Sequence, residues 1–342
     1  MKIALTPYSQ RTNSILSLLT RKMGLYTGPI PNIRKFFVHN SKADAYLCPH
    51  NLKSVEKDQD FIRMLVNLSE KKPVIFFNLG DFPRSHLKGN FIFIQTGHEV
   101  GRNLDTSRTV IIPYNVRAVE SKNRTWRNSS PVLSFVGQVP NITAGRVLRS
   151  LFPIPPMPLE LRKPAPFQRN SALIRKVGAK KILSKEGGFA TTRKYHGGSA
   201  NHVADVNGNR SIFESVMQNS DFVFSPRGDH NNSFRFYESI SAGRIPVVPA
   251  SSVYLPDINS REIVDIIRIT DCLSRNLWNC VEDYWNNLDV DSYTDVQNHL
   301  RKTFQLELSY YKYLPNLLSR SIDEVRKLQP ILLSSEPRRK SE

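Results

Sequence analysis

Short apolar runs, each followed by a turn or a helical pattern, recur along the chain in two successive series. This alternation limits the chain to an α/β fold. The runs of the first series are β-branched or aromatic and lack strict alternation, as expected of parallel strands covered on both faces. They are residues 3–5, 45–47, 74–77, 91–94 and 110–112, with helical patterns at 9–21 and 57–70. We therefore predict a parallel α/β sheet within residues 1–115.

A second series follows residues 116–130, which are polar, carry little apolar periodicity and are interpreted as a linker. Its predicted strands are 132–136, 222–224, 245–248 and 264–269, and its predicted helices are 143–152, 210–219, 233–243, 272–288 and 293–313. The glycine-containing stretch 187–202 is interpreted as a loop. Two such series predict two Rossmann-like domains facing a cleft. The expected division is 1–120 for an acceptor-side domain, 131–290 for a donor domain, 291–330 for C-terminal helices that pack back across both, and 331–342 for a tail.

Composition excludes several classes of protein. No run among the 342 residues approaches the ~18 apolar residues of a membrane span, so an integral membrane protein is excluded. The N-terminus MKIALTPYSQ turns polar too early for a secretion signal. The three cysteines lie far apart and form neither a zinc pattern nor a disulfide framework. A cytoplasmic location is therefore expected, without a membrane anchor.

The net charge of +18 is concentrated in the first part of the chain. Residues 131–198 hold 12 basic and 2 acidic side chains, whereas residues 199–330 hold 13 and 17. Such a basic region favours an anionic partner: nucleotide phosphates, an acidic glycan, lipid headgroups or nucleic acid. The alternative is that the charge only keeps the protein surface soluble.

The segment 219–248 carries the most specific pattern in the chain. It reads as a strand, a loop rich in turn residues, a helix beginning near Ser233, a turn at Gly243 and a second strand. A helix N-terminus suits an anion such as a diphosphate, and Arg227 and Arg235 can add charge-assisted hydrogen bonds to it. Glu238 lies one turn into the helix, where it could accept bonds from ribose hydroxyls. The alternative is an exposed ion pair between Arg235 and Glu238, which stabilises a helix only weakly.

This segment resembles the core motif of the exostosin-like glycosyltransferases. That motif has a strand, a Pro-Arg-Gly loop, a Ser-x-Arg-x-x-Glu helix, a Gly and an Ile-Pro-Val strand, all of which occur here in order. Weaker similarity extends to 132–137, 78–81 and 254–256. The resemblance covers residues 75–340 loosely and 211–256 strongly. Two features depart from it: Phe224 or Ser225 and Arg244 stand where many relatives carry Cys, and the membrane anchor of many animal and plant relatives is not expected here. A compact bacterial or viral version is therefore expected.

The resemblance implies a GT-B architecture that binds a nucleotide sugar, with a UDP-sugar favoured. It implies inverting transfer to a hydroxyl of a glycan or lipid-linked glycan, as in polysaccharide biosynthesis, with no cofactor and no obligatory metal. The positions that match its donor-binding residues are Gly137, Gln138, Arg227, Gly228, Ser233, Arg235 and Glu238. The departures at Phe224, Ser225 and Arg244 affect packing more than chemistry.

Inverting transfer needs a general base, for which the sequence offers three candidates. Asp81 follows the strand 74–79, and His98 and Glu99 follow the strand 91–94. Ligands in open α/β sheets lie beyond the carboxyl ends of strands, so each is well placed. Each is equally well explained as a turn or loop residue. Asp289-Val290-Asp291 superficially resembles a metal motif, but we interpret it as a helix cap and predict no metal site.

Two other functions remain open. The basic segment 162–194 could bind nucleic acid through its phosphates, although no recognised nucleic-acid motif accompanies it, so nucleic acid is not the expected partner. The same segment could instead dock on an anionic membrane surface or an acidic polysaccharide that carries the acceptor. The aromatic residues of the last helices recur at helical spacing and are predicted to be core.

Overall fold

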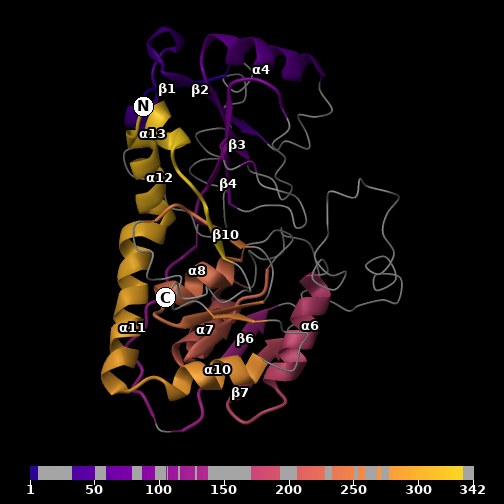
Figure 1. Ribbon diagram of the computed structural model, residues 1–342, viewed down its shortest axis with the longest axis vertical. Helices are drawn as coiled ribbons and strands as arrows, with labels where there is room; N and C mark the ends of the chain where they lie inside the picture. The colour runs from indigo at the N-terminus through magenta and orange to yellow at the C-terminus, as the bar shows by residue number, and fades with distance from the viewer. Residues whose placement is uncertain are drawn as a thin grey trace, which may run out of the picture. The chain divides into compact units, whose positions relative to one another are not determined.

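The protein consists of two compact units (Figure 1). The computed structural model describes residues 1–6, 33–50, 59–78, 87–96, 105, 107–114, 116–127, 129–137, 171–192, 206–227, 233–249, 253–258, 268–270 and 277–333. The first unit contains residues 1–117, 253–259 and 306–332, and the second contains 118–252, 260–305 and 333–342. Each unit is therefore built from segments that lie far apart in the sequence.

The first unit is built on a five-stranded sheet whose strands follow one another in chain order. The strands are β1 (Ile3–Leu5), β2 (Ala45–His50), β3 (Val74–Asn78), β4 (Phe91–Gln95) and β5 (Thr109–Ile111), and every neighbouring pair is parallel. Helix α4 (Gln59–Lys71) connects β2 to β3, and two 3₁₀ turns, η2 (Ile33–Phe36) and η3 (Asn40–Lys42), precede β2. The predicted strands are confirmed, whereas the helix predicted at 9–21 lies outside the described residues.

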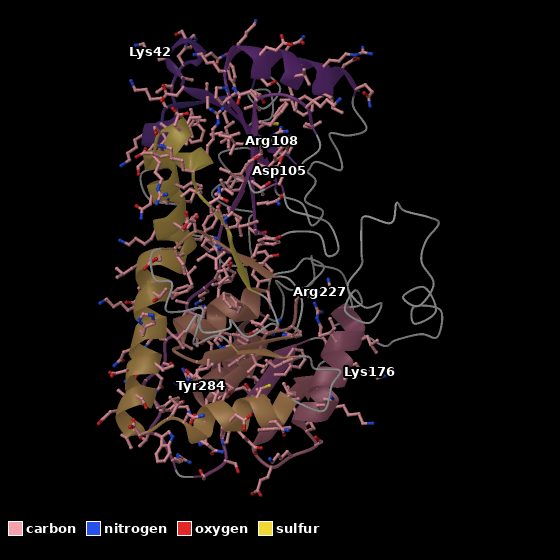
Figure 2. The ribbon with its side chains drawn as sticks, viewed as in Figure 1. Lys42, Asp105, Arg108, Lys176, Arg227 and Tyr284 are labelled. Carbon is pink, nitrogen blue, oxygen red and sulfur yellow. The ribbon has the colours of Figure 1, made fainter. Side chains whose placement is uncertain are left out.

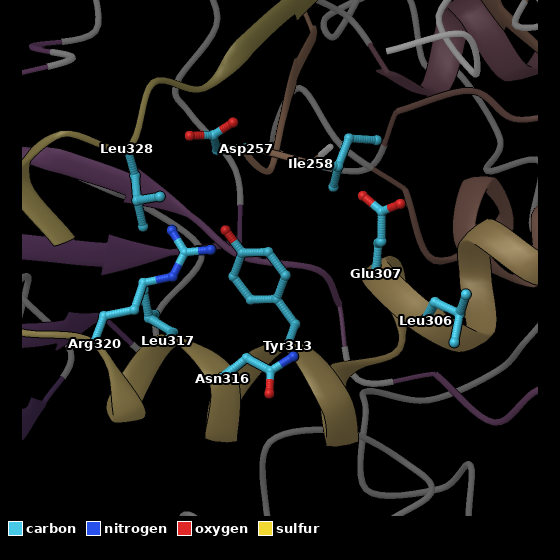
Figure 3. Close-up of a pocket in the computed structure, with 9 residues that line it drawn as sticks. All are labelled: Asp257, Ile258, Leu306, Glu307, Tyr313, Asn316, Leu317, Arg320 and Leu328. Atoms are coloured by element: carbon cyan, nitrogen blue, oxygen red, sulfur yellow. The ribbon is translucent and has the colours of Figure 1, made fainter. Parts of the chain in front are cut away.

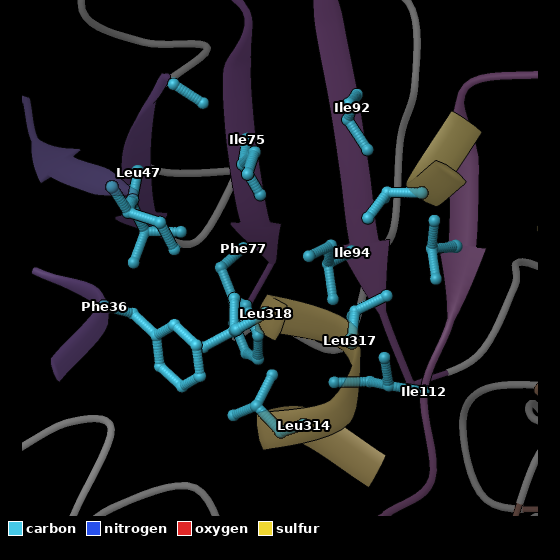
Figure 4. Close-up of a cluster of buried hydrophobic side chains, with 14 of the residues drawn as sticks. Phe36, Leu47, Ile75, Phe77, Ile92, Ile94, Ile112, Leu314, Leu317 and Leu318 are labelled. Atoms are coloured by element: carbon cyan, nitrogen blue, oxygen red, sulfur yellow. The ribbon is translucent and has the colours of Figure 1, made fainter. Parts of the chain in front are cut away.

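Both faces of this sheet are covered, which explains why its strands lack polar alternation. On one face Phe61 and Leu65 of α4 pack against strand residues such as Phe76. On the other face the C-terminal helices α12 (Tyr310–Ser319) and α13 (Ile322–Arg326) supply the cover. Figure 4 shows Leu314, Leu317 and Leu318 of α12 against Phe77 and Ile94 of the sheet. Helices from the C-terminal region therefore complete the hydrophobic core of the sheet formed by the N-terminal region.

The second unit is also built on a parallel five-stranded sheet, but its strand order is β11-β9-β8-β6-β7. Its strands are β6 (Leu133–Gly137), β7 (Gly188–Thr192), β8 (Phe222–Phe224), β9 (Ile245–Pro249) and β11 (Arg268–Thr270). Its helices are α6 (Ser171–Ile182), α7 (Val206–Gln218), α8 (Phe234–Ser241), α10 (Leu277–Asn286) and α11 (Val290–Thr303). The prediction of two Rossmann-like α/β domains is confirmed.

Two predictions for the second unit were wrong. Residues 188–192, interpreted as loop, form the edge strand β7 paired along its length with β6; edge strands need fewer apolar residues, so the pattern is weak. Residues 116–130 are not a free linker, because the described part of this segment packs on the second unit. Arg124 Nε lies 2.6 Å from the Asp221 carboxylate, and Trp126 stacks on Trp285. The polar composition of this segment gave no indication that Arg124 and Trp126 would contact the rest of the second unit.

The C-terminal region departs from the single helix predicted at 293–313. Helix α11 is followed by a π-helical turn, η6 (Phe304–Leu308), and α12 starts after the N-cap Ser309. The cap predicted at Asp289 is confirmed: its side chain accepts a hydrogen bond from the backbone N–H of Ser292 at 2.8 Å, within a capping box. Strands β10 (Val253–Leu255) and β12 (Ile331–Leu333) form a separate pair.

The aromatic residues of this region are core, as predicted. Buried members are Trp278, Trp285, Tyr293, Phe304, Tyr310 and Tyr313. Within the part of the chain that the structure describes, no helix is long and apolar enough to cross a membrane.

Candidate functional site

The strand order of the second sheet reverses at β6. From β6 the chain moves to β7 on one side, then returns to β8 on the other side of β6. Because such crossovers are right-handed, the reversal places α6 and α7 on opposite faces. The contacts agree: Gly178 of α6 lies against the Phe224 ring, whereas Phe213 and Met217 of α7 cluster with Val223, which points to the other face. Ligands of open α/β sheets bind beyond the carboxyl ends of strands at a switch point of this kind.

Arg235, on the first turn of α8, lies at the carboxyl end of β6. Its Nε donates to the carbonyl oxygen of Val136. Its guanidinium carbon lies 5.8 Å from the ring centre of Phe135 and 5.9 Å from that of Phe213. These rings come from the strand and from α7. A guanidinium held between a carbonyl and two aromatic faces keeps its other N–H groups fixed in direction, which suits recognition of phosphate oxygens.

Gly137, the last residue of β6, makes room for this arrangement. A Cβ atom at this position would lie 3.0 Å from Nη2 of Arg235 and 2.9 Å from the Phe135 ring. Any side chain would therefore displace the guanidinium or the ring. The glycine predicted here from the family motif has a physical reason: it lets Arg235 approach the strand end.

Arg227 follows β8 at the same edge of the sheet. Strand β8 is parallel to β6 and ends at Phe224, three residues before Arg227. Arg227 is only 4% exposed. Figure 2 shows it beside α6, and Arg175 of that helix donates a hydrogen bond from Nη2 to the Arg227 carbonyl oxygen at 3.3 Å. The loop after β8, helix α8 and helix α6 therefore each bring an arginine to the carboxyl edge of this sheet.

The remaining motif residues lie on α8. Ser233 is its N-cap with an extended backbone at φ −143°, and its side chain makes no capping hydrogen bond. The first backbone N–H groups of a helix have no partners within the helix, and the helix dipole makes this end attractive to anions. Glu238 is 7% exposed, so the alternative of an exposed surface pair with Arg235 is excluded. Gly243 follows the C-cap of α8 with φ at +68°, so the helix ends at the predicted glycine.

The structure therefore places Gly137, Arg227, Ser233, Arg235 and Glu238 at one edge of the second sheet. The other predicted residues lie outside the described residues: Gln138 and Gly228 of the donor motif, and Asp81, His98 and Glu99 as candidate bases. Arg175 was not predicted as part of this site. It stood within the basic segment 162–194, and only the packing of α6 brings it to Arg227.

The described part of that basic segment does not form one charged face. Lys176 and Lys180 are exposed on α6, whereas Lys185 forms an ion pair with Glu282 and lies over the Trp278 ring. The Nζ of Lys181 is buried. Nothing in the described residues tests the two alternatives for this segment, namely binding of nucleic acid or of an anionic membrane surface.

The opposite, amino end of the same sheet also holds arginines, and there they take part in a network of hydrogen bonds between protein groups. Arg244 is 1% exposed and donates to the Gln297 side chain at 2.6 Å and to the carbonyls of Met217, Lys122 and Gln218. Burial lowers its pKa to about 10, so it stays charged at neutral pH. Asp221 accepts from Arg124, from Tyr293 at 2.7 Å and from the Val132 N–H. The expectation that Arg244 serves packing is confirmed.

A small cavity of about 80 Å³ lies within the first unit (Figure 3). Its polar lining groups belong to Asp257, Glu307, Tyr313, Asn316 and Arg320. The Tyr313 hydroxyl donates to the Ile111 carbonyl at 3.4 Å, and its pKa is raised, chiefly by burial. Asp257 accepts from the Gln329 N–H at 3.2 Å. The first bond joins α12 to β5, and the second joins the segments that contain Asp257 and Gln329. None of the predicted site residues lines the cavity.

Within the described ranges, no three His, Cys, Asp or Glu side chains cluster closely enough to hold a metal ion. The sequence matches no model of a protein family and no curated protein.

Among solved structures, the chain is similar to the glycosyltransferase of kitacinnamycin at 10% identity, with a TM-score of 0.37 over 86% of this chain and 80% of that one. It is also similar to the lipopolysaccharide outer core galactosyltransferase WaaB at 12% identity, with a TM-score of 0.36 over 81% and 75% of the two chains. A third is WaaG, a glycosyltransferase involved in lipopolysaccharide biosynthesis, at 11% identity and a TM-score of 0.35 over 82% and 75%. Likenesses this distant add nothing to the topology described above.

Proposed function

We propose that the chain is a glycosyltransferase that moves a sugar from a nucleotide sugar to a hydroxyl of a glycan or lipid-linked glycan. The observation that carries this proposal is the position of Arg235. It is fixed by Val136, Phe135 and Phe213 at the switch point of a parallel sheet, on the first turn of a helix whose N-terminus opens at the same edge. A diphosphate is the anion that such a set of groups suits best.

Four described residues of the donor motif have roles in this proposal. Arg227 and Arg235 neutralise the diphosphate, and the α8 N-terminus at Ser233 adds backbone donors. Glu238 accepts hydrogen bonds from the ribose hydroxyls. The order of motif residues supports an exostosin-like enzyme of GT-B architecture, and we favour a UDP-sugar as donor. No cofactor or obligatory metal is required.

Transfer with inversion then proceeds in a single displacement. A general base removes the proton of the acceptor hydroxyl, and the oxygen attacks the anomeric carbon from the face opposite the diphosphate. The bond from that carbon to the diphosphate oxygen breaks, and the leaving diphosphate keeps the electron pair. Its negative charge is stabilised by the two arginines and the helix end. Asp81, His98 and Glu99 remain the candidates for the base.

Titration of the purified chain with UDP tests the donor site, with release of UDP from UDP-sugars as the activity assay. Arg235→Ala removes one charge-assisted contact and should weaken UDP binding by roughly tenfold or more. Arg301→Ala is the matched control, because Arg301 also donates to a backbone carbonyl, that of Ala242, at the other end of the sheet. A folded wild-type chain that binds none of UDP, GDP, ADP or CDP would overturn the proposal.

A further inference from the structure

Helix α6 brings a third arginine to the edge of the sheet where the proposed donor site lies. The helix precedes β7, which is parallel to β6, so it runs back from the carboxyl end of the strands toward their amino end. Its N-terminal turns therefore lie at the carboxyl edge, as the hydrogen bond from Arg175 to the Arg227 carbonyl shows independently.

Close packing fixes α6 in this position. Gly178 lies so near the sheet that a Cβ atom would come within 2.4 Å of the Phe224 ring. Ile174 and Ile182 on the same helix are 1% and 0% exposed. Arg175 is three residues before Gly178, so the two positions share the helix face toward the sheet. This geometry carries the Arg175 guanidinium to the loop that follows β8, where it reaches Arg227.

The charge of this edge exceeds what the family motif accounts for. At this edge Arg175, Arg227 and Arg235 contribute three positive charges, and Glu238 contributes one negative charge. Arg175 and Arg235 come from helices on opposite faces of the sheet, and Arg227 comes from the loop between them. Guanidinium groups arranged around one strand end suit an anion with several oxygens, because each can form a directed hydrogen bond.

We propose that Arg175 is a diphosphate-binding residue of the donor site, supplied by α6 and independent of the Pro-Arg-Gly and Ser-x-Arg-x-x-Glu motif. This inference rests on the proposed function. The guanidinium of Arg175, which donates to the Arg227 carbonyl oxygen, also donates a hydrogen bond to a phosphate oxygen of the nucleotide. Arg175 thus recognises the phosphates and not the base or the ribose.

The test compares UDP, UMP and uridine on the full-length wild-type chain and on Arg175→Ala, Arg175→Gln and Arg175→Lys. We expect Arg175→Ala to weaken UDP binding about tenfold, and Arg175→Lys to recover part of the loss, because a charged hydrogen bond is removed and then partly restored. Uridine affinity should stay within about twofold of the wild-type value, since the nucleoside carries no phosphate. Arg175→Gln keeps a donor for the Arg227 carbonyl without the charge, and should behave like Ala toward UDP.

Lys176→Ala is the matched control, because Lys176 is the neighbouring cation on the same helix and is exposed (Figure 2). It should leave the affinity for UDP unchanged. Equal losses of UDP and uridine affinity in Arg175→Ala would mean that Arg175 only positions the loop, and would overturn the inference. So would unchanged UDP binding in a variant that unfolds at the wild-type temperature. Failure of the wild-type chain to bind any nucleotide would instead overturn the proposed function itself.

Discussion

The two sheets of this protein have the same number of strands and the same parallel pairing, yet they differ in strand order. The first runs β1-β2-β3-β4-β5 in chain order, whereas the second reverses direction at β6. Only a reversal sends successive connections to opposite faces and leaves the strand ends between them open to a ligand. The described residues of the donor motif, namely Gly137, Arg227, Ser233, Arg235 and Glu238, all belong to the second unit, which is built on this sheet. Topology thus explains why one of two similar units is expected to hold the nucleotide.

A second difference separates the two ends of the second sheet. At the amino end, Arg244 is enclosed by four protein acceptors, and Asp221 is satisfied by an arginine, a tyrosine and a backbone N–H. At the carboxyl end, Arg235 donates to the carbonyl oxygen of Val136 and lies against the rings of Phe135 and Phe213, next to the N-terminus of α8. The first arrangement stabilises the fold, whereas the second orients a charge. Four substitutions test these two comparisons, between the sheets and between the ends of the second sheet. They are given from the largest expected effect to the smallest.

Asp221→Ala should have the largest effect, on stability. It removes the buried carboxylate that pairs with the half-buried Arg124, and it leaves the hydroxyl of Tyr293 without its acceptor. Breaking a buried ion pair costs about 3–5 kcal/mol, so the unfolding transition of the second unit should move sharply in urea. Asp221→Asn retains the shape and should lose less. Because the cluster lies at the amino end, folded protein should keep its nucleotide affinity; a large loss there would break the distinction between the two ends.

Leu314→Ala tests whether the first sheet depends on the C-terminal helices. Leu314 is 1% exposed and lies in the core between α12 and the sheet (Figure 4). Truncation of such a buried leucine costs about 2–5 kcal/mol. Leu306→Ala is the control, because Leu306 is 56% exposed and should change stability by no more than about 0.5 kcal/mol. Equal effects in chemical denaturation would show that α12 does not complete this core.

Gly137→Val should affect binding more than folding. The added side chain would occupy the space of the Arg235 guanidinium, and we expect UDP to bind about tenfold more weakly as one charged contact is lost. Gly243→Ala is the matched glycine at the opposite end. There φ is +68° and a Cβ would meet Gln297, so stability should fall while the UDP affinity of the folded protein stays the same. The reverse pattern in isothermal titration would contradict the site.

Gln95→Leu should have the smallest effect and bears on the first sheet alone. Gln95 ends β4 and is 2% exposed, and its buried Oε1 has no hydrogen-bond partner among the described residues. Replacing it with an apolar side chain of similar size should keep stability within about 1 kcal/mol of the wild type or raise it. UDP affinity should not change, because the residue belongs to the sheet without a reversal. A clear loss of UDP affinity would indicate that the nucleotide binds at the first sheet, which would contradict the proposed donor site on the second.

Much of this structure follows from the local pattern of the sequence. Runs such as Val74–Phe77 are too apolar and β-branched to be anything but buried parallel strands, and Gly243 and Asp289 have the residue types that end and begin helices. The motif around Arg235 was likewise readable, because its strand, loop and helix are continuous in the chain. The sequence by itself therefore determined the α/β class and five of the positions at the candidate site.

Tertiary structure alone decided which distant segments share a unit. It also decided which arginines stabilise the fold and which lie at the proposed donor site. Arg244 and Arg235 stand nine residues apart with the same side chain, but strand direction sends them to opposite ends of the sheet. Arg175 reaches Arg227 across 52 positions only because Gly178 packs against Phe224. The apparent linker is held by Asp221, and α12 covers a sheet built some 200 residues earlier. Contacts over such separations depend on topology and close packing, which no local pattern records.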